Sequence, residues 1–509
     1  MLAKIYSAAL VGIDSTLIEV EVDVASFSMP YFGIVGLPDK AVEEAKERVK
    51  SAIKNSGATF PVKRIIINLA PADLPKEGPA YDLPIAIGIL IASGQLQADL
   101  SHSLILGELS LDGSLRSIRG AVPYTFLAQE KGFKKIYLPM QNAREASLIA
   151  GIEIYPVSCL NDLSLHLTDQ KKIEVQIPLD YEQYSNLNVE FEFDLKEIKG
   201  QEQAKRALEI TAAGGHNLAL KGPPGAGKTL LARSLPSILP KLSLKEALDI
   251  SKIYSTAGLL PKDKPLILNR PFRSPHHTIS HVGLIGGGSN PKPGEISLAH
   301  RGVLFLDEFP EFPRAVLESL RQPLEDGVVT VSRAKASCFF PSRFMLVTAA
   351  NPCPCGYLGD TKKACQCLPS QITRYQKRIS GPILDRIDLQ VEVPAVKVEK
   401  LTSENEKIES SSEVRARVEN ARARQRKRFN GGVAMCNAEM HLKEIKAYCQ
   451  IEKEGLLILK EAITNLGLSA RSYFKILKVS QTIADLENQE KISAAYIAEA
   501  LQYRFRDHN

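Results

Sequence analysis

The sequence predicts an α/β protein with two successive α/β domains and a third, all-helical domain. Short apolar runs that favour strands alternate with helical stretches from the N-terminus to about residue 170, and again from Phe193 to about Pro394. After about residue 412 the pattern is helical and no clear strand is visible. Two polar stretches separate these parts and are predicted linkers. The predicted boundaries are 1–170, 171–192 (linker), 193–395, 396–412 (linker) and 413–509.

Composition places the chain among ordinary globular proteins. Of its 509 residues, 44% are hydrophobic and 24% are charged, and no apolar run approaches the roughly 18 residues of a membrane span. The apolar N-terminal stretch stops at Asp14 and continues into an alternating strand pattern, so we expect no targeting segment, a cytoplasmic location and no membrane partner. The net charge of +6 is too mild to indicate nucleic-acid binding by itself.

The first domain is predicted from its buried elements. Arg64–Pro71, Ser103–Leu111 and Lys134–Pro139 have the apolar character of buried strands, and Pro84–Leu96 that of a buried helix. Together they indicate a compact α/β domain.

The segment GPPGAGKT fits G-x-x-x-x-G-K-[ST] at every fixed position, between an apolar strand-like run and a helix-like one. That context predicts a phosphate-binding loop, in which backbone N–H groups and a helix N-terminus converge on phosphate oxygens. Lys228 is expected to reach the β- and γ-phosphates of ATP, and Thr229 to bind Mg²⁺. The predicted loop consists of Gly222, Pro223, Pro224, Gly225, Ala226, Gly227, Lys228 and Thr229.

Two further strands are predicted to end in residues suited to nucleotide chemistry. In Gly302–Phe309 an apolar run precedes Asp307, expected to hold Mg²⁺ through water, and Glu308, expected to polarise the attacking water. The alternative is an acidic pair that only caps a strand. A third strand ends at Asn351, whose amide can orient the water or touch the γ-phosphate, although asparagine after a strand is usually a turn residue.

The order of these elements resembles an AAA+ ATPase, in which Asn351 would take the sensor-1 role. Specific segments further resemble the magnesium-chelatase-like YifB/ComM family, and the similarity covers nearly the whole chain. The resemblance implies a homo-oligomeric ring ATPase, expected to be hexameric, that acts on single-stranded or branched DNA, with branch migration during natural transformation as its best-described role. The segments are GQEQAKRALEITAAGGHNLALKGPPGAGKT, RPFRSPHHTISHVGLIGGG, PGEISLAHRGVLFLDEFPEF, RQPLEDG, AANPCPCGYLGD and GPILDRIDL.

The same resemblance assigns roles to two arginines. Arg386, in ILDRIDL, matches the family's arginine finger, which would reach the ATP of a neighbouring subunit. Arg471, in LSARSYFKIL, matches the sensor-2 arginine of the helical lid. The alternative for either residue is an ordinary surface ion pair.

Two segments within the ATPase domain and one in the lid are candidates for DNA contact. In Gly327–Phe344 the resemblance places a β-hairpin that faces the ring's pore, where Arg333 and Lys335 would touch phosphates; an exposed basic turn is the alternative. His276 and His277 lie in a second insertion, which we expect to be a pore-facing loop rather than a metal site. The basic stretch 413–429 predicts either a solvated helix face or a DNA-tracking one.

Four cysteines fall within 15 residues, as C-x-C followed by C-x-C. Four thiolates can surround one tetrahedral Zn²⁺, although C-x₂₋₄-C is the usual spacing. We expect a structural zinc site, with reduced thiols as the alternative. The candidate ligands are Cys353, Cys355, Cys365 and Cys367.

The N-terminal domain resembles the Lon-type protease domain without its catalytic pair. Ala80 stands where that family has its nucleophilic serine, and Val122 where it has its lysine. Since a Ser–Lys dyad needs both groups, we expect the Lon-like fold without proteolysis.

The sequence thus favours an ATP-driven, ring-shaped DNA motor. Two alternatives use the same ATPase core: the motor subunit of a metal-chelatase-type complex, and an ATP-dependent protein remodeller. The polymer or complex that stimulates hydrolysis would distinguish the three.

Overall fold

A computed structural model describes residues 2–25, 29–182, 191–261, 266–288, 291–332, 337–360, 363–395, 408–430, 432, 434–466 and 468–504. By compactness the chain forms two units. The first comprises residues 1–187, 244–268 and 332–339, and the second comprises residues 188–243, 269–331 and 340–509.

The first unit is built on a seven-stranded mixed sheet with the order β3-β4-β2-β1-β5-β8-β9. Strands β1 and β2 form an antiparallel hairpin, and β5, β8 and β9 run parallel to β1. The strand bounds are β1 Leu2–Val11, β2 Asp14–Ala25, β3 Tyr31–Val35, β4 Arg64–Ala70, β5 Ser103–Ile105, β8 Lys135–Pro139 and β9 Glu153–Val157; a small pair is β6 Glu108–Leu109 and β7 Leu115–Arg116.

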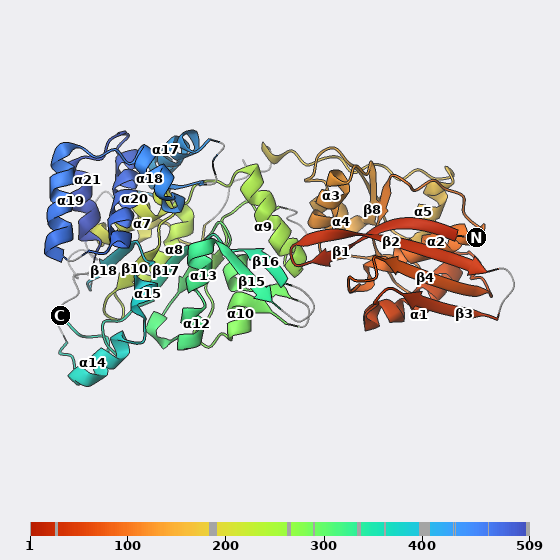
Figure 1. Ribbon diagram of the computed structural model, residues 1–509, viewed down its shortest axis with the longest axis horizontal. Helices are drawn as coiled ribbons and strands as arrows, with labels where there is room; N and C mark the ends of the chain where they lie inside the picture. The colour runs from red at the N-terminus through yellow and green to blue at the C-terminus, as the bar shows by residue number, and fades with distance from the viewer. Residues whose placement is uncertain are drawn as a thin grey trace. The chain divides into compact units, whose positions relative to one another are not determined.

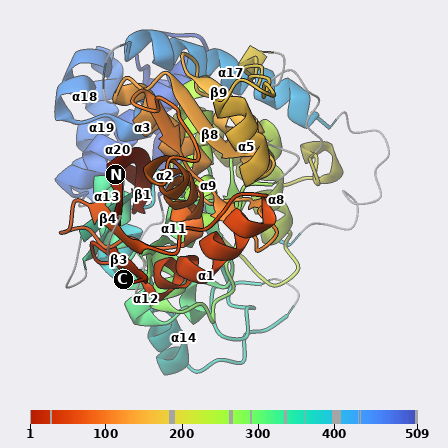
Figure 2. The same ribbon diagram turned by 90° about the vertical axis from the view of Figure 1, so that its right-hand side faces the viewer.

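Helix α2 forms the centre of the first unit's core. It packs against β1 and β2 (Figure 1) and lies beside β1 in the turned view as well (Figure 2). Nearly all of its side chains are buried, which explains its uniformly apolar sequence. The helices of this unit are α1 Lys40–Asn55, α2 Asp82–Ala92, α3 Ala121–Glu130, α4 Met140–Ala146, α5 Leu160–Leu167 and α9 Leu244–Ala257.

The predicted strand Ser103–Leu111 is divided into β5 and β6. Between them the backbone N–H of Leu106 bonds to Tyr137 O at 3.0 Å, whereas that of Gly107 turns to Ala80 O at 2.9 Å. A Cβ on Gly107 would lie 2.8 Å from a methyl carbon of Leu115, so any larger residue at this bend would require the side chain of Leu115 to shift.

The second unit contains a five-stranded parallel sheet with the order β11-β14-β17-β10-β18. Strand β10, which leads into the glycine-rich loop, lies between β17 and β18, and β14 is the next strand beyond β17. In a parallel sheet all carboxyl ends share one edge, so the residues that follow β10, β14 and β17 meet there. The bounds are β10 Leu218–Lys221, β11 Phe272–Arg273, β14 Val303–Leu306, β17 Met345–Ala350 and β18 Leu389–Glu392.

Helices and a short hairpin, in which β12 pairs with β13, belong to the second unit. The paired strands β15 and β16 occupy the predicted arms within Gly327–Phe344. Their bounds are β12 Gly286–Gly287, β13 Lys292–Pro293, β15 Val328–Ser332 and β16 Ser337–Pro341. The helices are α7 Glu202–Gly214, α8 Lys228–Ile238, α10 His281–Ile285, α11 Glu295–Leu298, α12 Arg314–Glu318, α13 Arg321–Asp326, α14 Pro369–Gln376 and α15 Gly381–Leu384.

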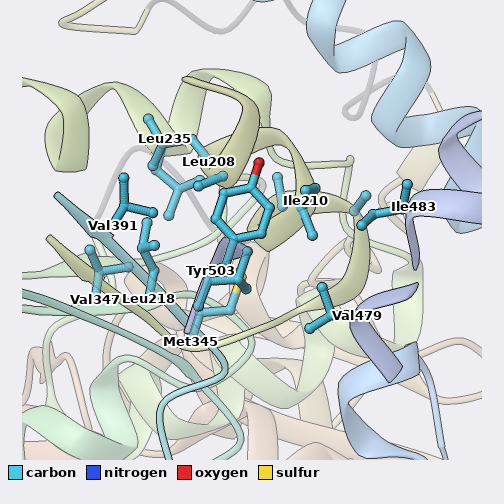
Figure 3. Packing of buried hydrophobic residues seen from close by; sticks show 14 of the residues in the cluster. Leu208, Ile210, Leu218, Leu235, Met345, Val347, Val391, Val479, Ile483 and Tyr503 are labelled. Atoms are coloured by element: carbon cyan, nitrogen blue, oxygen red, sulfur yellow. The ribbon is translucent and has the colours of Figure 1, made fainter. Parts of the chain in front are cut away.

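The predicted C-terminal lid is helical in its described residues and shares a core with the sheet. Figure 3 shows Tyr503 and side chains of α20 meeting residues of α7, α8, β10, β17 and β18 in one apolar cluster. The lid is therefore packed directly on the nucleotide-binding core. Its helices are α17 Ser411–Arg428, α18 Leu442–Tyr448, α19 Lys453–Leu466, α20 Ala470–Leu486 and α21 Ala494–Gln502.

Among the described helices, none is both long enough and apolar enough to cross a membrane.

Candidate nucleotide site

The glycine-rich loop connects β10 to α8, which begins at Lys228. Gly225 and Gly227 have φ angles of +76° and +88°, the left-handed region that favours glycine, and the space where their Cβ atoms would stand is open. Gly222 is required for another reason, since its Cβ would lie 2.1 Å from the backbone oxygen of Val393. The loop is thus an open cradle at a helix N-terminus, a geometry that suits phosphate.

Lys228 is held at the base of this cradle. Its Nζ donates to Gly222 O and Pro223 O, both at 2.8 Å, and to Asn351 Oδ1 at 3.1 Å. The side chain is buried, and burial lowers the pKa of its ammonium group. These three partners are uncharged oxygens, so a polyanion at the loop would supply the charge that they lack.

The other residues predicted for ATP and Mg²⁺ lie at the same sheet edge. Thr229 Oγ1 donates to Asp307 Oδ2 at 2.7 Å, which brings the two expected Mg²⁺ ligands into direct contact. Asn351 follows β17 and reaches Lys228 across the loop. Hydroxyl and carboxylate oxygens are the ligands that Mg²⁺ prefers, so this pair fits the ion.

Glu308 has a contact that the sequence did not suggest. Its backbone is in the left-handed region at φ +51°, and its Oε2 lies 3.3 Å from Nδ1 of His277. His277, expected on a loop, lies in the turn between β11 and α10, against the expected water-polarising carboxylate. Nothing in the sequence pairs these two residues; the fold brings them together because β11 is the neighbour of β14 in the sheet.

Arg386 and Arg471 meet at a shared partner, Glu325. Arg386 Nη2 lies 2.6 Å, and Arg471 Nη2 2.8 Å, from the same atom, Oε1 of Glu325. Arg386 is buried and also donates to Pro382 O, whereas Arg471 is about half exposed. Glu325 lies in the segment RQPLEDG, where nothing in the sequence marks it as the shared partner of two arginines.

The loop that carries Arg386 is tied to the sheet through Asn217 and Asp388. Asn217 Nδ2 donates to Arg386 O at 2.9 Å, and Asn217 Oδ1 accepts from the backbone of Leu346 in β17 at 2.8 Å. Asp388 accepts from Asn217 N at 3.0 Å and pairs with Lys475 of α20 at 3.2 Å. Burial alone would raise the pKa of Asp388, but the charge of Lys475, supported by His216 and the backbone N–H of Asn217, holds that pKa well below its usual range.

The four cysteines converge, as their spacing predicted. Their Sγ atoms all lie within 4.8 Å of one another, and three of the separations are 3.4, 3.6 and 3.7 Å. A tetrahedron of thiolates about 2.3 Å from Zn²⁺ would have edges of about 3.8 Å. The donor set therefore fits a closed tetrahedral metal site.

The cysteine loop lies beside the phosphate cradle. Cys353 comes two residues after Asn351, and a Cβ on Gly356 would lie 2.6 Å from the ring of Pro224 in the glycine-rich loop. Backbone N–H groups of Tyr357 and Gln366 lower the pKa of the Cys355 thiol to about 6, which favours a thiolate.

The expected DNA contacts are only partly visible. Arg333 and Lys335 lie outside the described residues. On the basic helix α17, arginines turn inward: Arg415 bonds to Ser237 O, Arg417 pairs with Glu209 at 2.6 Å and Arg428 pairs with Asp485. These side chains hold α17 against α7, α8 and α20.

In the first unit the two positions of the Lon dyad are apolar and buried. Ala80 is 7% exposed and Val122 is fully buried. Neither side chain can serve as a nucleophile or a base, which agrees with the expected loss of that chemistry.

Comparison with known proteins identifies the family. Residues 194–401 match the family described as magnesium chelatase, subunit ChlI; residues 20–142 match subunit ChlI of Mg-chelatase, and residues 408–504 match its C-terminal family. Over 507 residues the chain is 45% identical to competence protein ComM of Haemophilus influenzae, covering 99% of this chain and 97% of that protein.

Two further relatives are similar to the whole chain and to a part of it, respectively. Protein YifB of Escherichia coli is 44% identical over 508 residues, which is 99% of this chain and 97% of the relative. Lon protease 2 of Bacillus subtilis is 30% identical over 138 residues, which is 26% of this chain and 24% of the protease. The resemblance and the fold class expected from the sequence are thereby confirmed. With its Lon-like N-terminal domain, AAA+ core and helical lid, the chain belongs to the YifB/ComM family of magnesium-chelatase-like AAA+ proteins.

Proposed function

We propose that the protein is an ATP-hydrolysing, ring-forming DNA motor that promotes strand exchange at branched DNA during transformation or recombination. The observation that carries the ATPase half is the convergence of Lys228, Thr229, Asp307 and Asn351 at one sheet edge. The DNA half is supported by similarity along the full chain to a protein named for competence.

Each residue would contribute to hydrolysis through its own chemistry. Lys228 would exchange its carbonyl partners for the β- and γ-phosphate oxygens and neutralise charge there. Thr229 and Asp307 would hold Mg²⁺, which when bound shields the phosphate charges. Glu308 would accept a hydrogen bond from the attacking water, and Asn351 would orient that water against the γ-phosphate.

The remaining group would come from a neighbour. Arg386 of one subunit would neutralise the charge that develops on the γ-phosphate bound by the next, so hydrolysis would require a closed assembly of subunits. A homo-oligomeric ring, expected to be hexameric, would satisfy that requirement. Pore-facing Arg333 and Lys335 would then grip the DNA backbone without reading its sequence.

The test is ATP hydrolysis by the full chain with no polymer, with single-stranded DNA and with forked DNA, using Lys228→Ala as the blank. We expect DNA to stimulate hydrolysis several-fold and forked DNA to be unwound, with both effects lost in the variant. Lys228-dependent hydrolysis that is indifferent to DNA would reject the DNA motor. A metal–tetrapyrrole complex and an unfolded protein would then be tested as activators, for the chelatase and remodeller alternatives.

We also propose that Cys353, Cys355, Cys365 and Cys367 hold a structural Zn²⁺. The thiol geometry supports the proposal, and four cysteine ligands leave no open position for catalysis. Metal analysis of protein purified without added zinc should give about one zinc per chain. A zinc content near zero, with four titratable thiols in the native protein, would contradict it.

A further inference from the structure

The carboxylate of Glu325 is placed so that it resembles a substrate phosphate. It is the one glutamate of α13, and its Oε1 accepts from Nη2 of both Arg386 and Arg471 at 2.6 and 2.8 Å. An anion shared by two guanidinium groups is the arrangement that such groups also make with a terminal phosphate. The two arginines come from segments far apart in sequence, before β18 and at the start of α20, so the tertiary fold brings them to this one oxygen.

The environment of the three groups is uneven. Arg386 is 9% exposed, and its Nε has no hydrogen-bond partner among the described residues. Glu325 and Arg471 are 46% and 52% exposed. The nearly buried guanidinium therefore has unused donor capacity, while the carboxylate that holds it can move into solvent at small cost.

We propose that Glu325 is an internal latch: it occupies the arginine pair in the absence of a neighbour's nucleotide and is displaced by the γ-phosphate of that nucleotide. The exchange breaks two ion pairs with a carboxylate and forms ion pairs with a phosphate group of higher charge. The latch keeps two like-charged arginines together before ATP arrives, and it lowers the rate at which Arg386 engages. Glu325 thus acts through the arginines, as a positioning residue. This inference rests on the proposed trans role of Arg386, but it does not depend on DNA.

The experiment measures steady-state ATP turnover by the full-length protein without DNA. Glu325→Gln keeps the shape of the side chain and removes its charge. We expect turnover to rise about twofold to fivefold, the factor expected when one partly exposed ion pair no longer competes. The apparent KM for ATP should fall, because phosphate no longer has to displace a carboxylate.

The decisive comparison is the double variant Glu325→Gln with Arg386→Ala. If the latch acts through Arg386, the rise should disappear and the double variant should turn over ATP at the rate of Arg386→Ala alone. A rise that persists without Arg386 would overturn the proposal, as would unchanged or lower turnover in Glu325→Gln by itself. Thermal unfolding of each variant shows whether a lower ATP turnover is caused by loss of folded protein. Glu325→Asp keeps the charge on a shorter side chain, so its ATP turnover should stay below that of Glu325→Gln.

A matched control is Glu487→Gln. Glu487 is 49% exposed and pairs with Arg206 at 3.0 Å. The change removes a similar ion pair that involves neither Arg386 nor Arg471, so it should leave ATP turnover unaltered. Absence of any Lys228-dependent hydrolysis in the wild-type protein would reject the ATPase and the latch together. Hydrolysis that is normal but insensitive to DNA would reject only the DNA motor, and the latch comparison would still hold.

Discussion

The residues that surround the phosphate cradle are held by contacts with uncharged oxygens or with each other. Lys228 is bonded to two carbonyl groups and Asn351, Thr229 is bonded to Asp307, and Glu308 meets His277. The positions of Lys228 and Thr229 could be predicted from the fixed motif, and those of Asp307, Glu308 and Asn351 from the ends of strands. The partner of Glu308 could not, since histidines in an insertion carry no signal for a contact with a distant strand end.

At this scale we predict that His277 orients Glu308. Replacing His277 with alanine leaves the half-exposed carboxylate free to sample more rotamers, so fewer of them face the water. We expect kcat for ATP to fall about fivefold while KM is unchanged, measured by steady-state hydrolysis. His102→Ala, on the first unit, serves as the control. An unchanged kcat in His277→Ala would show that the contact does not matter for turnover.

Among the elements, β10 and its loop are fixed by neighbours on both sides. Gly222 approaches the end of β18, and Gly356 of the cysteine loop approaches Pro224. The function of the basic side chains on helix α17 could not be predicted from the sequence. Their pattern is compatible with a solvated face and with a DNA-tracking face, and in the structure Arg415, Arg417 and Arg428 attach the lid to its neighbours.

The close approach at Gly222 predicts that Gly222→Ala destabilises the second unit. The new Cβ would stand 2.1 Å from a backbone oxygen, so β18 or the loop must shift. We expect the free energy of unfolding to drop by about 2 kcal/mol, as for other overpacked sites, measured by thermal or denaturant unfolding. Gly381→Ala is the control, because nothing lies within 4 Å of its Cβ position. Equal stability of the two variants would contradict the packing argument.

The position of the cysteine loop predicts that metal removal weakens nucleotide binding. Chelation, or Cys365→Ser, should loosen the segment between Asn351 and Gly356 and with it the support of Pro224. We expect the Kd for a fluorescent ATP analogue to rise about threefold to tenfold, the scale of losses at supporting positions of metal sites. Cys159→Ser, outside the cluster, is the control. Unaltered affinity in fully zinc-free protein would rule out this coupling.

For the chain as a whole, the lid and the nucleotide-binding core form one unit with one continuous core. Apolar side chains from Leu195 to Tyr503 belong to a single cluster (Figure 3), and the ion pair of Asp388 with Lys475 crosses from the arginine loop to α20. The lid is therefore positioned by the same contacts that stabilise the core. The first unit has separate apolar clusters of its own.

The ion pair between the arginine loop and α20 predicts that Asp388 makes a pH-dependent contribution to the free energy of unfolding. Because its pKa is held below that of an aspartate in the unfolded chain, its stabilising effect is complete above about pH 4 and is lost as the pH falls through the lower range. Asp388→Asn should lower the free energy of unfolding by about 3 kcal/mol at pH 7, since it leaves Lys475 without its buried partner. That deficit should shrink below about pH 4, measured by denaturant unfolding at several pH values. The exposed Asp180→Asn is the control, and a deficit independent of pH would contradict the assignment.

The sequence by itself determined the fold class, the glycine-rich loop, the strand ends that carry Asp307, Glu308 and Asn351, and the clustering of four cysteines. These features are local: a loop, a strand and a short thiol-rich turn are specified by residues adjacent in the chain. Only the tertiary structure decided that Glu325 joins Arg386 to Arg471, that His277 meets Glu308 and that Asp388 links α20 to Asn217. Each of these contacts connects segments that are distant in sequence, and spacing along the chain does not encode which of many possible charged partners the packed sheet and helices bring together.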